Sequence, residues 1–246
     1  MNIKEDDRSG EARLEVNGKV AIITWSRGSK KNAFDSELAF SVGELFRSIQ
    51  NRFDIAVIML KGEGSVFCSG WDLSEIDASK GNPKKAVMLV NSGRACLQAL
   101  DALDQLVISA VNGDVMGFGV SILGHSDIVI QAKNVKIRLP ELRHGVVPSS
   151  VLGDLVPIVG VSAALRWSVL GEIPDSEAIT TGLVTAIVDF EEFDQFIADL
   201  LKKLSMLDAE AVLATKRLSK LINGDSAQIA RRLGDEASIE ALLTTI

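Results

Sequence analysis

The sequence predicts an α/β domain followed by a mostly helical C-terminal part. Two observations support this fold class. Strand-like apolar runs alternate with helical patterns through about the first 150 residues. From Val151 onward the pattern is mostly helical, with a single strand-like exception. A mixture of strands and helices in one half indicates an α/β core, to which the helical part is attached.

The sequence up to about residue 111 predicts a hairpin, two buried strands, a loop and a long helix. The stretch "ARLEVNGKVAIITW" (12–25) predicts a hairpin, because Asn17-Gly18 favours a tight turn between two runs of β-forming residues. Short continuous apolar runs predict buried strands at 54–60 and 106–111. A glycine-punctuated stretch (61–72) predicts a loop. A long helix is expected over 83–103, because Pro83 suits a first helical turn.

Similar patterns predict the elements of the second half. A short helix is expected at 119–126, followed by strands at 127–132 and within "VKIRLPE" (135–141). A further strand is predicted at 184–189. The predicted helices cover 151–159, 162–170, 175–182, 191–205, 208–222 and 227–245.

Bulk composition excludes several classes of protein. The chain has 246 residues, 47% of them hydrophobic, which is enough for a sizeable core. Its net charge of −7 disfavours nucleic-acid binding through a general positive field. The apolar runs are too short to span a bilayer, and the polar N-terminus has no signal-peptide core. A protein without membrane segments, located in the cytoplasm, is therefore expected.

Classical metal and nucleophile patterns are weak in this sequence. Cys68 and Cys96 are the only cysteines, which indicates a reducing compartment rather than a disulfide framework. With two histidines and two isolated cysteines, a zinc site is not expected, and no metal is predicted. The nucleophile motif GxSxG is also missing from the sequence. Cys68 is read as a small buried apolar residue.

The stretch "GVSILGHS" (119–126) comes within one residue of the phosphate-binding pattern GxxxxGK[ST]. His125 stands where that pattern requires a lysine, and an ordinary histidine is mostly neutral near pH 7. The residues between the glycines are apolar and suit a buried helical turn. A nucleotide loop is therefore not favoured, and His125 is expected to be structural. The free amides of a helix start remain suited to another anion, such as a reaction oxyanion.

Five ordered segments together resemble the crotonase (enoyl-CoA hydratase/isomerase) superfamily. The segment "FCSGWDLSEI" (67–76) is similar to the family's FxAGxDLxE element, and "ISAVNGDVMGFG" (108–119) to its IAAVNGxAxGGG element. The segment "SDIVIQAKNVKIRLPELRHGVVP" (126–148) is similar to its CDxxxAxxxAxFxxPExxxGxxP element. Two shorter matches are "KKNAF" (30–34), which resembles the first acyl-CoA loop, and "GLVTAIVD" (182–189). The five segments occur in the family's order with compatible spacing, and the resemblance extends over nearly the whole chain.

The resemblance implies a crotonase-like spiral of ββα units over residues 1–190. It implies a helical trimerisation or lid region over 191–246, and homotrimers or hexamers. The expected ligand is an acyl thioester of CoA or of an acyl-carrier protein. No separate cofactor is expected, because CoA or phosphopantetheine is part of the substrate.

The resemblance also assigns candidate site residues. Glu141 is the expected acid/base, and the backbone N–H groups of Trp71 and Phe118 are expected to hold the thioester oxygen. Substrate contacts are predicted for Ser121, His144, Gly70 and Gly117. CoA contacts are predicted for Arg27, Lys30, Asn32, Ala33, Ser69, Asp72 and Leu73, where Asp72 is read first as a loop organiser.

The expected chemistry follows from the number of glutamates. Hydratases of the family use two, and here Ser121 occupies the position of the first while Glu141 supplies the second. One carboxylate beside an oxyanion hole suits a one-glutamate dehydratase or hydratase of 3-hydroxyacyl and enoyl thioesters. Enoyl-CoA isomerisation, acyl-thioester decarboxylation and non-catalytic thioester binding remain alternatives. The stretch "LPELRHGVVPSSVL" also resembles polyketide β-branching dehydratases and, over "PELRHG", carboxymethylproline synthases.

Overall fold

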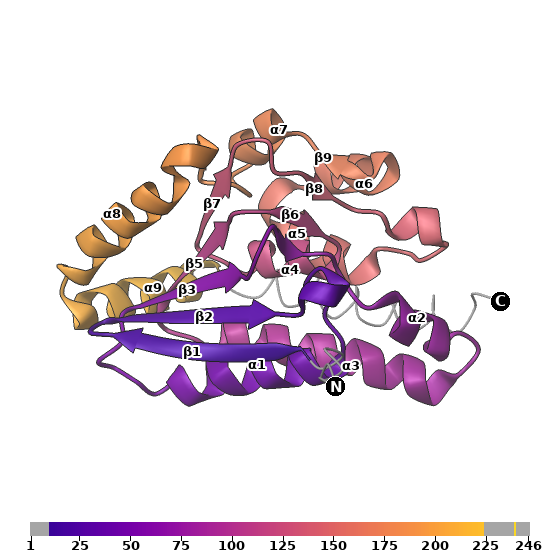
Figure 1. Ribbon diagram of the computed structural model, residues 1–246, viewed down its shortest axis with the longest axis horizontal. Coiled ribbons are helices and arrows are strands. Elements are labelled where there is room, and N and C mark those ends of the chain that lie inside the picture. The colour runs from indigo at the N-terminus through magenta and orange to yellow at the C-terminus, as the bar shows by residue number, and fades with distance from the viewer. Residues whose placement is uncertain (1–9, 224–238, 240–246) are drawn as a thin grey trace, which may run out of the picture.

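The computed structural model describes residues 10–223 and residue 239. Two sheets and a set of covering helices make up this part of the chain (Figure 1). The expectation of an α/β core with helices concentrated after residue 149 is confirmed. The predicted helix at 227–245 falls almost entirely outside the described residues.

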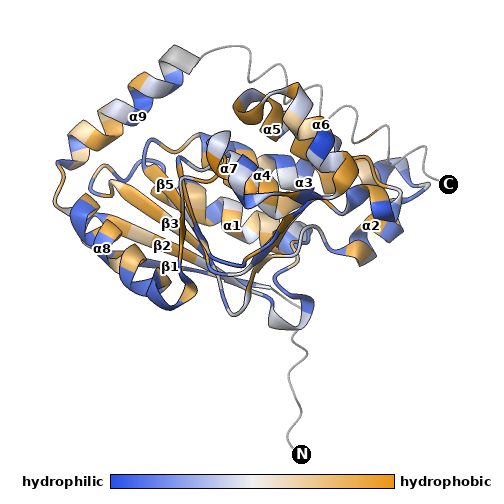
Figure 2. Ribbon diagram, turned by 90° about the horizontal axis from the view of Figure 1, so that it is seen from above, coloured by the Kyte–Doolittle hydropathy of each residue, from blue (hydrophilic) through white to orange (hydrophobic). Residues whose placement is uncertain are grey.

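The larger sheet has six strands in the order β1-β2-β3-β5-β7-β10. A hairpin joins β1 to β2, and the remaining neighbours pair in parallel. Figure 2 shows β3 and β5 as mainly apolar, as expected for parallel strands covered on both faces. The strands are β1 (Glu11–Asn17), β2 (Val20–Ser26), β3 (Val57–Gly62), β5 (Leu106–Val111), β7 (Ile128–Ala132) and β10 (Ala186–Val188).

The smaller sheet has four short strands in the order β4-β6-β8-β9. Consecutive pairs β3/β4, β5/β6 and β7/β8 each contribute one strand to either sheet. This repeated step from one sheet to the other produces a spiral of ββα units. The strands are β4 (Val66–Cys68), β6 (Asp114–Met116), β8 (Ile137–Arg138) and β9 (Glu172–Ile173).

Helices cover the sheets and close the ends of the spiral. Helices α1 (Ser36–Ile49) and α3 (Pro83–Asp101) pack against each other along one side of the large sheet (Figure 1). The others are α2 (Leu73–Ser79), α4 (Phe118–Gly124), α5 (Ser149–Val159), α6 (Val161–Leu170), α7 (Asp175–Thr180), α8 (Phe193–Ser205) and α9 (Ala209–Asn223). Short 3₁₀ turns are η1 (Gly28–Lys30), η2 (Glu141–His144) and η3 (Phe190–Glu192). None of the helices among the described residues is long and apolar enough to cross a bilayer.

The main differences from the sequence-based elements concern α1, α2 and three short strands. Helix α1 was not predicted, although the Asp35 side chain caps it by accepting from the Leu38 amide at 2.8 Å. Strand β4 lies within the stretch predicted as a loop, and helix α2 follows that stretch directly without having been predicted. Strands β6 and β9 span only three and two residues. The hairpin turn uses Gly18-Lys19 rather than Asn17-Gly18, because Asn17 still pairs with Val20. Gly18 supplies the positive φ of 59° that such a turn requires.

Candidate active site

A cavity of about 460 Å³ opens between α3, the start of α4, the η2 turn and α5. Its other wall is the loop that follows β4. All the predicted site residues except Arg27 and Asn32 line this cavity. The predicted site residues that line the cavity come from four separate parts of the chain, which are 30–33, 69–73, 117–121 and 141–144.

Two glycines bring the loops after β4 and β6 into contact. Gly70 and Gly117 have positive φ angles of 94° and 49°, which favour glycine over other residues. A Cβ atom at Gly117 would lie 2.9 Å from Glu141 Oε1 and 3.6 Å from the Gly70 Cα. Both loops and the Glu141 carboxyl group thus meet at one point, and a side chain at position 117 would intrude on it.

The two candidate amides belong to these same loops. Phe34 pairs with the loop in parallel, since its amide donates to Gly70 O at 2.8 Å and its carbonyl accepts from the Asp72 amide at 2.7 Å. In a parallel pairing this pattern leaves the N–H of the intervening residue, Trp71, directed away from Phe34. Phe118 is the first residue of α4, so its N–H has no acceptor within the helix.

Aromatic packing fixes the loops that carry both amides. The Trp71 and Phe118 rings meet edge to face with their centroids 5.0 Å apart, and the centroids of the Phe34 and Phe118 rings are 5.1 Å apart. A Cβ atom at Gly93 of α3 would lie 3.1 Å from the Trp71 ring and 3.2 Å from the Phe118 ring. The two bulky residues therefore pack against each other and against α3. The indole N–H of Trp71 also donates to Glu75 at 3.1 Å.

Glu141 places a carboxyl group in an apolar part of the cavity. It begins the η2 turn, and its Oε2 atom is buried without a hydrogen-bond partner among the described residues. Burial raises the pKa of Glu141 to about 7, although a hydrogen bond with its own backbone acts in the opposite direction. A carboxyl group that is half ionised near neutral pH can both take and give a proton.

Ser121 and His144 also line the cavity but differ in burial. Ser121 is 1% exposed on α4, and its Oγ has no hydrogen-bond partner among the described residues. His144 is exposed at the end of η2. Ser121, which the resemblance places at the first glutamate position, therefore presents a hydroxyl group without a hydrogen-bond partner among the described residues.

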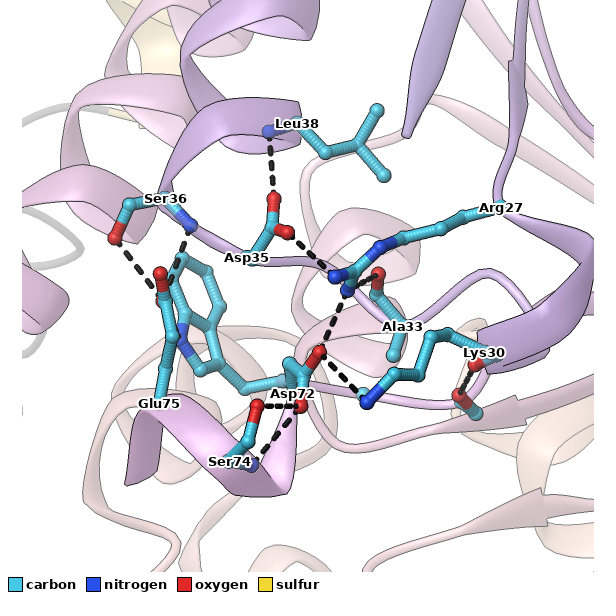
Figure 3. A network of polar contacts seen from close by, with 12 residues as sticks. Arg27, Lys30, Ala33, Asp35, Ser36, Leu38, Asp72, Ser74 and Glu75 are labelled. Atoms are coloured by element: carbon cyan, nitrogen blue, oxygen red, sulfur yellow. Dashed lines mark hydrogen bonds and ion pairs between the residues drawn. The ribbon is translucent and has the colours of Figure 1, made fainter. Parts of the chain in front are cut away.

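Arg27 lies inside an ion-pair cluster (Figure 3). Its guanidinium contacts Asp35 at 2.7 Å and Asp72 at 2.8 Å, and its side chain is 6% exposed. Burial alone would raise the pKa of Asp72, but hydrogen bonds from Ser74 and Arg27 lower it to about 2. The predicted contact of Arg27 with CoA phosphates does not fit this geometry, because its charge is buried between two carboxylates.

Asn32 also has a different place from the one predicted. Its Oδ1 accepts from the Arg27 amide at 2.8 Å, and its Nδ2 donates to the carbonyls of Glu63 and Val66 at 2.8 and 2.6 Å. With 1% exposure and no part in the cavity wall, Asn32 organises the loop rather than facing a ligand.

The remaining predicted CoA contacts lie around the cavity wall. Ala33 is buried, while Leu73 is half exposed at the first position of α2. Ser69 donates to the Lys30 carbonyl at 3.2 Å. Lys30 is exposed, and its Nζ lies 3.5 Å from Asp72 Oδ2. Lys30 can therefore turn toward an anion outside the cavity without leaving a buried carboxylate unpaired, because Arg27 also holds Asp72.

His125 lies between two carboxylates rather than at a phosphate loop. Its Nδ1 lies 2.6 Å from Asp101 Oδ1, and its Nε2 lies 3.1 Å from Asp154 Oδ1. Burial would lower the pKa of His125, but the Asp154 charge and the hydrogen bonds to both carboxylates raise it to about 9. Two neighbouring carboxylates would repel a phosphate, so the structure agrees with the expectation of a structural His125.

Asp154 is a cavity residue that the sequence reading missed. It borders the cavity from α5, is 3% exposed, and its Oδ2 has no hydrogen-bond partner among the described residues. The available signal was a lone charged residue in the apolar helix "SSVLGDLVPIV".

Burial raises the pKa of the Cys68 thiol to about 12, which agrees with the prediction that Cys68 is a packing residue. Within the described part of the chain, no group of acidic, His or Cys side chains is arranged to hold a metal ion.

The fold and the cavity together define a class of α/β protein with a mainly apolar cavity between its helices and loops. The family model for enoyl-CoA hydratase/isomerase matches residues 15–238. A carnitinyl-CoA dehydratase from Salmonella arizonae is 31% identical over 215 residues, covering 86% of this chain and 81% of the relative. The chain therefore belongs to the enoyl-CoA hydratase/isomerase family, that is, the crotonase superfamily.

Solved structures show the same fold. An enoyl-CoA hydratase/isomerase from Mycobacterium paratuberculosis superposes with a TM-score of 0.86 at 21% identity, covering 96% of this chain and 94% of that chain. An enoyl-CoA hydratase from Bacillus halodurans gives a TM-score of 0.84 at 22% identity, with 95% and 96% covered. The predicted crotonase-like spiral is thereby confirmed.

Proposed function

We propose that this protein is a one-glutamate dehydratase or hydratase that interconverts 3-hydroxyacyl and enoyl thioesters. The observation that carries the proposal is the meeting of Glu141 with the Gly70 and Gly117 loops in one cavity. The adjacent amides of Trp71 and Phe118 are available for a ligand oxygen. The names of the 30–31% identical relatives, carnitinyl-CoA dehydratases, favour dehydration over the other reactions of the family.

The amides would stabilise charge where it develops. Removal of a proton from Cα of a thioester places negative charge on the carbonyl oxygen, forming an enolate. Two fixed N–H donors at that oxygen lower the barrier because they are already oriented before the reaction. Loss of one such donor lowers kcat by about 10²–10³-fold in other enzymes.

Glu141 would take and return the proton. Its pKa of about 7 lies near neutral pH, where one carboxyl group can act as a base in one step and as an acid in the next. In dehydration, Glu141 takes the Cα proton, the Cβ–O bond breaks, and the same proton leaves with the hydroxyl group as water. Hydration is the reverse.

CoA is the thioester carrier that the relatives' names support, and an acyl-carrier protein remains an alternative. Lys30, exposed at the cavity wall, is the proposed contact for CoA phosphates. The site needs no separate cofactor in this mechanism. A homotrimer or hexamer and a polyketide-type substrate stay predictions of the resemblance.

Incubation with a panel of thioesters tests the proposal. We expect 3-hydroxyacyl-CoA to lose water, or enoyl-CoA to gain it, as followed by mass spectrometry. Isomerisation of 3-enoyl-CoA without hydration would favour the isomerase alternative. Release of CO₂ from a malonyl thioester that survives Glu141→Gln would favour the decarboxylase, and binding without turnover would favour a non-catalytic subunit.

A further inference from the structure

Three buried oxygen atoms of cavity-lining residues have no hydrogen-bond partner among the described residues. They are Ser121 Oγ, Glu141 Oε2 and Asp154 Oδ2. An unsatisfied buried polar atom costs about 1–3 kcal/mol, so such atoms are rare unless something else completes them. Three of them around one cavity indicate that a ligand group or water supplies the missing hydrogen bonds.

Asp154 differs from the carboxylates that have a purely structural role here. In Asp72, Oδ1 accepts from Ser74 and Oδ2 accepts from Arg27, so both oxygens are satisfied. In Asp154, Oδ1 accepts from His125 Nε2 at 3.1 Å, while Oδ2 is unused. One oxygen anchors the carboxylate and the other remains available.

The anchor is a charged one. His125 contacts Asp101 through Nδ1 and Asp154 through Nε2, so an imidazolium donates to both carboxylates. The pKa of about 9 that these contacts produce keeps His125 protonated at neutral pH. The Asp154 carboxyl group is therefore held in a fixed orientation by the imidazole ring at the end of α4.

Ser121 lies on the same side of α4 as this anchor. Ser121 and His125 are four residues apart, which places their Cβ atoms about 5–6 Å from each other on one helical face. Helix α5 packs against that face, since a Cβ atom at Gly124 would lie 3.7 Å from Asp154 Cβ, an ordinary van der Waals separation. Ser121 Oγ and the free oxygen of Asp154 thus belong to one region of the cavity wall.

We propose that Ser121 Oγ and Asp154 Oδ2 form a second polar subsite that binds the Cβ hydroxyl group of the substrate, or the water that replaces it. The inference rests on the proposed function and identifies the acyl group as one that carries a hydroxyl. The substrate hydroxyl donates to Asp154, and the Ser121 hydroxyl donates to the substrate oxygen. Asp154 takes no part in the proton transfer, because Glu141 carries the proton from Cα to the departing hydroxyl. His125 is a positioning residue.

Binding calorimetry with 3-hydroxybutyryl-CoA and butyryl-CoA tests this subsite. All titrations use Glu141→Gln protein, so that the hydroxyacyl ligand is not converted. We expect the hydroxyacyl-CoA to bind at least about 10-fold more tightly, because a site built for a hydroxyl is left unsatisfied by the analogue that lacks it. Adding Ser121→Ala or Asp154→Ala should reduce that ratio to near one.

Asp175→Asn is the matched control, because Asp175 accepts a hydrogen bond from Gln131 and lies outside the cavity wall. It should keep the full ratio. Equal binding of the two thioesters, or a full ratio in folded Ser121→Ala or Asp154→Ala protein, would overturn the subsite. If Asp154→Ala does not fold, the Ser121→Ala ratio decides. Failure of both thioesters to bind would instead refute the proposed function.

Discussion

Replacing Glu141 with Gln should strongly lower activity and at the same time stabilise the protein at pH 8. Glutamine keeps the size of the side chain but cannot take a proton, and general acid–base catalysis contributes about 10²–10⁴-fold. We therefore expect kcat for the best 3-hydroxyacyl-CoA to fall by at least about 10²-fold.

The stability gain follows from the pKa. The folded pKa of Glu141 is about 7, against an ordinary value of 4.5, so ionisation is unfavourable in the folded protein. The native state is favoured at low pH, and this contribution is lost as pH rises from about 4.5 to about 7. Each pKa unit corresponds to 1.36 kcal/mol. Relative to a protonated Glu141, ionisation therefore lowers the free energy of unfolding by about 3 kcal/mol at pH 8 and by under about 1 kcal/mol at pH 5.

Denaturant unfolding of wild-type and Glu141→Gln protein at pH 5 and pH 8 measures this difference. The protein concentration is held constant, since assembly would shift the apparent stability. The variant should be more stable by up to about 3 kcal/mol at pH 8, with a much smaller gain at pH 5. A gain independent of pH, or undiminished activity, would show that Glu141 is not the buried titrating base described here.

Three further predictions concern the elements around the cavity. Arg27→Met should lower the free energy of unfolding by about 3–5 kcal/mol, because the buried carboxylates of Asp35 and Asp72 lose the guanidinium group that contacts both. Denaturant unfolding measures this loss, and a value under about 1 kcal/mol would contradict the prediction. The pKa of His125 is raised to about 9, so its stabilising contribution is complete below about pH 6.5 and is lost as pH rises through about 9. In His125→Gln, the free energy of unfolding should therefore depend less on pH over this range. Denaturant unfolding that gives the same pH dependence in the variant and the wild type would argue against the charged cluster. Gly117→Ala places a Cβ atom 2.9 Å from Glu141 Oε1 at a positive φ, so kcat should fall at least about 10-fold while circular dichroism shows a folded protein; steady-state kinetics equal to wild type would refute the close approach of the two loops.

The sequence predicted the elements whose signals are local. Continuous apolar runs identified β3 and β5, and Pro83 marked the start of α3. Strands β4 and β6 were missed because three residues beside glycines carry too little periodicity. Helix α1 had a usable signal in Asp35 followed by apolar residues at helical spacing.

The candidate site shows a similar division. The motifs located Glu141 and the two glycine loops, because each is a short contiguous pattern. Arg27 was misplaced because a basic residue near a ligand loop reads the same whether it is exposed or buried. Asp154 was missed because its role depends on His125, 29 residues away, and that pairing exists only in the folded chain. Long-range pairing of charged groups is the part that one sequence does not reveal.

Deuterium exchange at Cα of butyryl-CoA tests the central claim most directly. This thioester has no hydroxyl group, so exchange in D₂O requires only a base and stabilisation of the enolate. The wild-type protein should introduce a single deuterium at Cα, since Glu141 approaches from one face, and Glu141→Gln should introduce none. Bound butyryl-CoA that gains no deuterium with the wild-type protein, or gains it equally with the variant, would contradict the assignment of Glu141 as the base.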